Sequence, residues 1–176
     1  MTGLYENINA IQNNPKLTFL LRSPKISLEP LGLSQIARQY EKTLNLSMEE
    51  ARYLSKITKG YAFAFQALGM LYWDEAAKNK KINRDSILRE LEILLDEYVY
   101  QKIWEGLSEQ DQRILRCLPE DGAIKTGEIC EQVELSTQSF SKYRERLINK
   151  GLIQSAAHGY VELTLPRFAQ VIRYYD

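Results

Sequence analysis

Apolar residues recur at every third or fourth position through much of the chain, which is the spacing of one face of an α-helix. Between residues 34 and 106 this pattern predicts four helices, which begin near Ser34, Ser47, Tyr61 and Asn83. We expect Ser34, Ser47 and Asn83 to cap their helices through side-chain oxygens. The expected core positions of the third and fourth helices are Phe63, Phe65, Leu68, Leu71, Trp73, Ile87, Leu91, Leu94, Leu95, Tyr98 and Trp104. Because the third helix is apolar nearly all round at its start, we expect it to form the buried centre.

The last seventy residues, 107–176, show a pattern of shorter segments. The expected segments are three helices capped by Ser108, Thr126 and Ser136, strands at 152–155 and 160–165, and a final short helix at 168–175. Helix, short helix, turn, helix and hairpin is the order of a winged helix-turn-helix. We therefore predict a mainly α fold, in which a four-helix domain, 31–106, precedes a winged helix with a small β-hairpin.

The first thirty residues, 1–30, are predicted to form a third part. Lys25–Glu29 alternates polar and apolar residues and is typical of a strand, while Pro24 ends any helix before it. A single strand cannot satisfy its own backbone hydrogen-bonding groups. We therefore expect this strand to be disordered, swapped, or paired with the same strand of a second chain in a dimer.

Composition excludes several classes of function. The 23 Lys and Arg residues balance 23 Asp and Glu residues, so the whole chain has no electrostatic attraction to nucleic acid or to a membrane surface. The longest apolar stretch, 61–73, is too short to span a bilayer, and we predict a cytoplasmic protein without a membrane partner. Cys117 and Cys130 are expected to be free thiols, and His158 has no ligand spacing around it. We expect no metal site.

The helix that begins after Ser136 would be the recognition helix of the predicted winged helix. Its candidate DNA-binding residues are Gln138, Ser141, Lys142, Arg144, Arg146 and Lys150. The Gln side chain could contact a base edge, and the cations could contact phosphates. Residues 107–176 nevertheless contain nine Lys or Arg against ten Asp or Glu, and the predicted wing tip, 156–159, has no cation. Duplex DNA and a protein therefore both remain possible partners.

Three stretches resemble the C-terminal region of AAA+ or STAND-type P-loop ATPases of the archaeal type. Thr2-Gly3-Leu4 is similar to the end of the family's sensor-1 strand. Leu17–Leu31 resembles its arginine-containing turn and final core strand, ending in an L-x-P-L passage. Thr58–Gly69 is similar to a lid stretch with the pattern T-x-G-x-P-x-x-x-Q-x-x-G, although Ala62 replaces the proline. The resemblance implies a helical lid at 31–106, a winged helix at 107–176 and a remnant of the ATPase core at 1–30.

By the same resemblance, Arg22 and Lys59 are the candidate nucleotide-sensing residues. The chain contains no G-x-x-x-x-G-K-[ST] motif and no strand that ends in paired acids. We therefore expect no catalysis and no cofactor on this chain, while ATP and Mg²⁺ are implied for the intact parent ATPase, whose missing core domain would be a partner.

Two functions follow from these observations. The first is a non-catalytic lid and winged-helix region of a P-loop ATPase, which acts in regulation and in docking of a partner or DNA. The second is a standalone winged-helix transcriptional regulator that binds DNA. An independent enzyme has little support, because the chain offers no Ser/His/Asp or Cys/His arrangement. The sequence does not exclude a catalytic pair of carboxylates.

Overall fold

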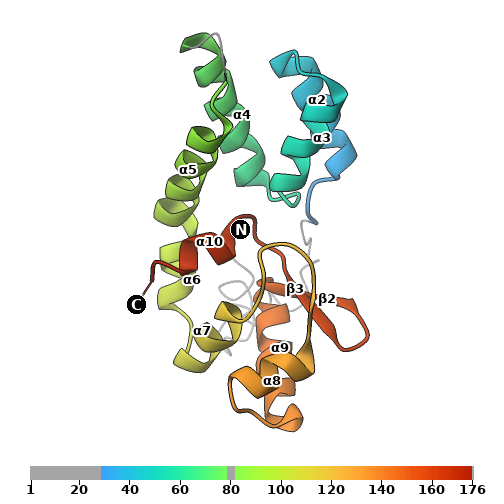
Figure 1. The fold of residues 1–176 in the computed structure, drawn as a ribbon, viewed down its shortest axis with the longest axis vertical. Helices are drawn as coiled ribbons and strands as arrows, with labels where there is room; N and C mark the ends of the chain where they lie inside the picture. Colours follow the sequence, from blue (N-terminus) through green and yellow to red (C-terminus); the bar gives the residue numbers. More distant parts are fainter. Residues whose placement is uncertain (1–28, 79–81, 176) are drawn as a thin grey trace, which may run out of the picture.

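The computed structural model describes residues 29–78 and 82–175 (Figure 1). This part of the chain is mainly helical and contains a small three-stranded antiparallel sheet, as the sequence predicted in outline. The predictions for Arg22, for Thr2–Leu4 and for most of the strand at 25–29 lie outside the described residues. Glu29, the one described residue of that predicted strand, belongs to neither a helix nor a strand.

Four helices form the first half of the described chain. They are α2 (Leu33–Leu44), α3 (Met48–Ile57), α4 (Ala62–Lys78) and α5 (Arg84–Leu95). Figure 1 shows α2 and α3 as one pair and α4 and α5 as a long hairpin. The side chains of Ser47 and Asn83 cap α3 and α5 as expected. Ser34 does not cap α2, because the helix begins earlier and its N-cap residue is Gly32. The Gly32 carbonyl accepts hydrogen bonds from the amides of Gln35 and Ile36.

The helix that begins with α5 contains a π-helical turn, and this turn changes which face of the helix is buried. Helix α5 continues through η2 (Asp96–Tyr100) into α6 (Gln101–Glu105). The buried positions along it are Ile87, Leu91, Leu95, Tyr100 and Trp104. The step of five residues between Leu95 and Tyr100 is that of a π turn. Tyr98 is therefore rotated outward and is 64% exposed, so the prediction that it faces the core is wrong.

Helix α4 is central but only one side of it is buried. Ala64, Ala67, Leu68, Leu71 and Tyr72 face the core, where α2 and α5 contact this helix. Trp73 is 60% exposed, because it lies on the side that these helices leave uncovered. The prediction of a core position for Trp73 is therefore wrong. Phe63 and Phe65 are half-buried, and their rings contact Tyr98 and Tyr40, respectively.

The second half of the chain forms helices and the three strands of the sheet. Its elements are α7 (Glu109–Arg116), β1 (Ile124–Lys125), α8 (Thr126–Gln132), α9 (Thr137–Asn149), β2 (Ile153–Ala157), β3 (Tyr160–Leu163) and α10 (Phe168–Ile172). The strand order is β1-β3-β2, with Ile124 opposite Val161. The sequence did not predict β1, because two residues are too few to show an alternating pattern. Thr126 is the first residue of α8 and not its cap; its amide donates to the carbonyl of Gly159 on the hairpin.

Helix α10 packs against the long helix and connects the two halves. The ring of Phe168 makes an edge contact with Tyr100, at 4.8 Å between centroids, and with Trp104, at 6.5 Å. The Tyr100 hydroxyl donates a hydrogen bond to the carbonyl of Pro166, just before α10. One continuous set of buried apolar residues therefore runs from α2 to α10.

Candidate functional site

The outer surface of α9 carries three polar side chains. Ser136 caps this helix by accepting from the amide of Ser139, and Phe140 and Leu147 are buried. We call the opposite side, with Gln138, Ser141 and Lys142, the α9 outer surface. All three residues are exposed, and their side chains make no hydrogen bond or ion pair within the described part of the chain. Their spacing places them on one face of the helix, as the sequence predicted.

Arg144 lies where α9 meets the hairpin. Its guanidinium donates a hydrogen bond of 2.6 Å to the hydroxyl of Ser155 on β2. The buried Nε atom of this side chain has no hydrogen-bond partner in the described part of the chain. Arg144 is thus held at the edge of the α9 outer surface, close to the strand that leads into the hairpin turn.

Arg146 connects α9 to α7. Its guanidinium donates twice to Asp111 Oδ1, from Nη2 at 2.6 Å and from Nε at 3.2 Å. Asp111 is only 1% exposed, and it also closes the capping box of α7 with Ser108. A buried carboxylate needs such a partner, since an unpaired charge is costly to bury. A phosphate contact by Arg146 stays a prediction, and this ion pair competes with it.

Lys150 is at the other end of α9. It is the C-cap residue of this helix and is half-buried. It is distant along the helix from Gln138, Ser141 and Lys142, which lie in the first two turns of α9. The structure therefore gathers Gln138, Ser141 and Lys142 on one surface and leaves Lys150 at the far end of the helix.

Lys59 lies in a junction between the two halves of the chain. It occupies the turn between α3 and α4 with a φ of 47°, and its ammonium lies 3.3 Å from Glu120 Oε1. The same Nζ donates to the backbone carbonyl of Glu120 and to that of Leu163, at 3.4 Å for the latter. Lys59 is thus bound to the loop before β1 and to the end of β3. A nucleotide-sensing role for it stays a prediction.

Glu120 holds the start of α10. Its Oε1 accepts from the amide of Arg167 at 2.6 Å, and its Oε2 accepts from the amide of Ala169 at 3.0 Å. Burial raises the pKa of Glu120 above its ordinary value, although the Lys59 ammonium and the two amides oppose this rise. The carboxylate therefore provides the cap that α10 lacks from its own N-cap residue.

Arg167 is the fourth charged residue between the two halves of the chain. Its φ is 58°, and its guanidinium forms an ion pair with Glu92 of α5, with Nε 2.8 Å from Oε1. We call the four side chains of Lys59, Glu92, Glu120 and Arg167 the junction. They come from four separate segments, so they fix how the helices α2–α5 lie against α7–α10. Each cation is paired with a carboxylate, which suits a role in positioning the two halves.

Gly60 makes the turn of the junction possible. Its φ is +78°, and a Cβ atom at this position would lie 2.6 Å from the carbonyl oxygen of Leu31. The amide of Leu31 also donates to the Gly60 carbonyl at 2.8 Å. Only glycine suits both the dihedral angle and the close approach of this backbone.

The described residues contain no group of three or more His, Cys, Asp or Glu side chains that could hold a metal ion. Cys130 is buried and Cys117 half-buried, both are free thiols, and burial raises the pKa of each. Within the same residues, no helix has the length and apolar character needed to cross a membrane.

Sequence reasoning missed three members of the junction, Glu92, Glu120 and Arg167. Each lies in an ordinary polar position, and no motif or spacing relates one to another. The partners of Arg167 and Lys59 are 75 and 61 residues away in sequence, respectively. Only the fold brings these charges together.

One family model matches part of the chain. The model of a family described as Domain of unknown function (DUF8462) matches residues 97–172, which is less than half of the chain. The match begins inside η2 and ends with α10, so it contains the aromatic contacts of Tyr100 and Trp104 with Phe168. No curated protein and no solved structure matches the chain.

Proposed function

We propose that residues 107–176 are a winged helix-turn-helix, that residues 31–106 are a helical lid, and that the two form a non-catalytic regulatory region of an AAA+ or STAND-type P-loop ATPase. The order of helix, β1, helix, helix and hairpin supports the first assignment. The absence of a G-x-x-x-x-G-K-[ST] motif from the sequence supports a region without catalysis. ATP and Mg²⁺ would bind the missing core domain of a cytoplasmic parent protein.

The junction carries this proposal. Lys59 belongs to the T-x-G stretch that resembles the ATPase lid, and its ammonium binds Glu120 in the loop before β1. Glu120 in turn holds the amides at the start of α10. A movement of residues 31–106 would therefore also move residues 107–176, which include α9. The reason is that ion pairs as well as apolar packing connect the two halves.

The α9 outer surface is the proposed docking site. Gln138, Ser141 and Lys142 are exposed, and their side chains have no partner among residues 29–78 and 82–175; Arg144 lies beside them against β2. These groups can contact base edges and phosphates, and they can equally bind polar groups of a protein. The second candidate function, a standalone DNA-binding regulator, rests on this same surface.

Binding of a fluorescent 20-base-pair duplex, followed by anisotropy at two salt concentrations, tests the DNA role. For DNA docking we expect affinity that falls as salt rises, and a loss of about fivefold or more in Lys142→Ala. The control Arg38→Ala, on an exposed part of α2, should bind as the wild type does. No binding at low salt would exclude duplex DNA and leave a protein as the docking partner.

The coding sequence upstream of residue 1 tests the ATPase assignment. A Walker A motif followed by a hydrophobic strand that ends in acids, in the same reading frame, would support it. A reading frame without either would contradict it and favour the standalone regulator.

A further inference from the structure

Helix α4 carries a second, mostly apolar stripe on the side that faces away from the core. Its residues follow one another at alternating intervals of three and four, and they are Phe63, Gln66, Met70, Trp73 and Ala77. Met70 and Trp73 are both more than half exposed, so no described element covers the stripe at these positions. Such alternating intervals are typical of a helix seam that packs along one other helix.

Tyr98 extends this stripe onto the neighbouring helix. The ring centroids of Phe63 and Tyr98 are 6.0 Å apart, and Tyr98 projects outward at the π turn. Half-buried Leu94 precedes Tyr98 by one turn on the same side of this helix. We call Phe63, Met70, Trp73, Leu94 and Tyr98 the hairpin face, because α4 and α5 form the long hairpin of Figure 1.

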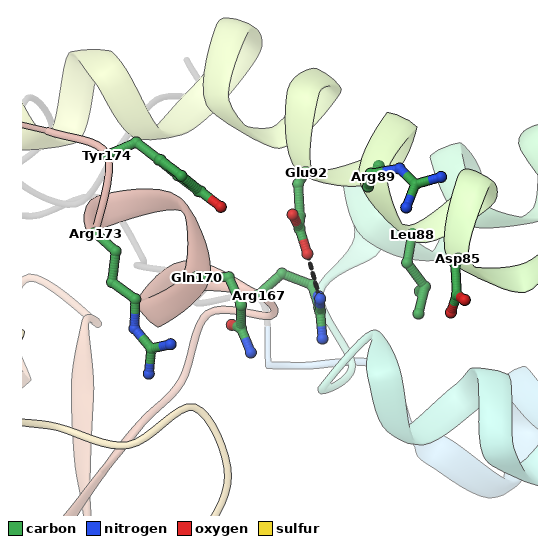
Figure 2. Close-up of a pocket in the computed structure, with 8 residues that line it drawn as sticks. All are labelled: Asp85, Leu88, Arg89, Glu92, Arg167, Gln170, Arg173 and Tyr174. Carbon is green, nitrogen blue, oxygen red and sulfur yellow. Dashed lines mark hydrogen bonds and ion pairs between the residues drawn. The ribbon is translucent and has the colours of Figure 1, made fainter.

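A different side of α5 contacts the region of α10. Figure 2 shows Glu92 directed toward Arg167, and the two side chains form an ion pair. In an α-helix, residues two positions apart point about 200° from each other around the axis. Glu90 and Leu94, two positions before and after Glu92, therefore point away from Arg167. The hairpin face is thus not the side of α5 that the sheet-bearing half covers.

Acidic side chains border the hairpin face. Asp74, Glu90 and Glu97 are exposed, and none of them makes a hydrogen bond or ion pair within residues 29–78 and 82–175. Each lies within four residues of a member of the face on its own helix. The exposed lysines Lys78 and Lys102 lie toward the two ends of the hairpin, so the border is acidic along its middle.

This charge distribution discriminates between possible occupants. A second copy of this chain would bring the same acidic border against the face, and like charges repel. A helix with cations beside its apolar seam would instead pair with Asp74, Glu90 and Glu97. Charge complementarity therefore favours a basic partner over self-association.

We propose that the hairpin face docks an amphipathic α-helix of another protein, which has an apolar seam and lysine or arginine residues beside that seam. The intervals of three and four residues on α4 match one helix packed along it. The exposed aromatic and Met side chains of the face contact the apolar seam, and the three bordering acids pair with the cations. The hairpin face is separate from the α9 outer surface, so this proposal does not depend on docking there.

The tryptophan fluorescence of the full chain tests whether the face is open. Trp73 is exposed, whereas Trp104, the other tryptophan of the chain, is buried. The difference between the spectra of the wild type and Trp73→Phe gives the emission of Trp73, which we expect at the wavelength of an indole in water. Emission typical of a buried indole in the free chain would mean that the face is already covered, and would overturn the proposal.

Binding of a synthetic helical peptide tests the chemistry of the partner. The peptide has about three heptads, with leucine at positions a and d and lysine at positions e and g. We expect a Kd of about 10 μM or lower by calorimetry and a shift of the Trp73 emission to shorter wavelength. Met70→Ala and Trp73→Ala should each weaken binding by about tenfold, and circular dichroism should show folded variants because both positions are exposed. Absence of binding to the wild type would overturn the proposal.

Charge variants separate this face from a general attraction to cationic peptides. The double variant Glu90→Gln/Glu97→Gln should weaken binding of the lysine peptide by about tenfold. The matched control Glu131→Gln/Glu145→Gln removes exposed acids of α8 and α9 and should bind as the wild type does. A peptide with glutamate in place of lysine should bind at least about tenfold more weakly. Equal losses in the two double variants, or equal binding of the two peptides, would overturn the proposal.

Sedimentation velocity of the wild type and Trp73→Ala tests the second copy as occupant. We expect the same sedimentation coefficient for both chains over a range of concentrations. Self-association that Trp73→Ala abolishes would assign the hairpin face to a second copy and overturn the proposal.

Discussion

The junction and the α9 outer surface use the same kinds of side chain in opposite ways. In the junction, Lys59 and Arg167 are each paired with a carboxylate that lies more than sixty residues away in sequence. On the α9 outer surface, Lys142 is exposed and its side chain has no partner within the described residues. Lys59 and Lys142 were both candidate functional residues in the sequence, whereas Arg167 was not. The difference shows that the role of a cation depends on which groups the fold brings to it.

Arg146 lies between these two extremes. It belongs to the same helix as Lys142, four residues further on, yet its guanidinium is bound to buried Asp111. Position on the same helix therefore does not by itself make a cation available to a partner.

Glu120→Ala should reduce the free energy of unfolding by about 3 kcal/mol, because it leaves Lys59 without its carboxylate and two amides of α10 without an acceptor. Urea unfolding followed by circular dichroism measures the change. The control Glu145→Ala removes an exposed carboxylate on α9 and should change stability by less than about 0.5 kcal/mol. Equal effects of the two substitutions would contradict the distinction between the junction and the surface.

Arg146→Ala should cost about 2 kcal/mol of stability, because Asp111 stays buried without a counter-ion. In a double-mutant cycle with Asp111→Ala, the combined loss should be smaller than the sum of the two single losses. Additive losses, measured by the same urea unfolding, would mean that the ion pair contributes nothing and that Arg146 resembles Lys142.

Tyr100→Phe should cost about 1 kcal/mol, because it removes the hydroxyl that donates to the Pro166 carbonyl and retains the ring against Phe168. Tyr98→Phe is the matched control, two residues earlier on the same π turn, and should leave the Tm unchanged. A larger fall in Tm for Tyr98→Phe would contradict the rotation of the helix face at η2.

Lys142→Ala should change stability by less than about 0.5 kcal/mol, since its side chain contacts no charged group in the described chain. Its effect should appear only in binding of a duplex or protein partner. Thermal unfolding of this variant measures the first expectation. A stability loss above about 1 kcal/mol would show that Lys142 has a structural role, as Arg146 does.

Local features of the fold were predictable from the sequence because they depend on neighbouring residues. Ser47, Asn83, Ser108 and Ser136 each cap a helix through an amide three residues further on. The helical spacing of apolar residues likewise predicted the mainly α fold. The exposed positions of Gln138, Ser141 and Lys142 followed from the same spacing, so this part of the candidate site was predictable.

Other features needed contacts that the sequence does not display. The π turn moved Tyr98 outward, and the uncovered side of α4 exposed Trp73, although both fitted the helical pattern. The two-residue strand β1 exists only because β3 lies beside it. A pattern along the chain reports which face is apolar, but the neighbouring elements decide how much of that face is covered.

The helices, most of their caps and the polar outer surface of α9 follow from local sequence, because hydrogen bonds and faces within a helix span only three or four residues. Lys59 and Arg167 join the two halves, and Arg146 is bound to Asp111, only because the folded chain brings distant segments together. Electrostatic interactions act through space, so the role of each charge depends on distances that chain position does not contain.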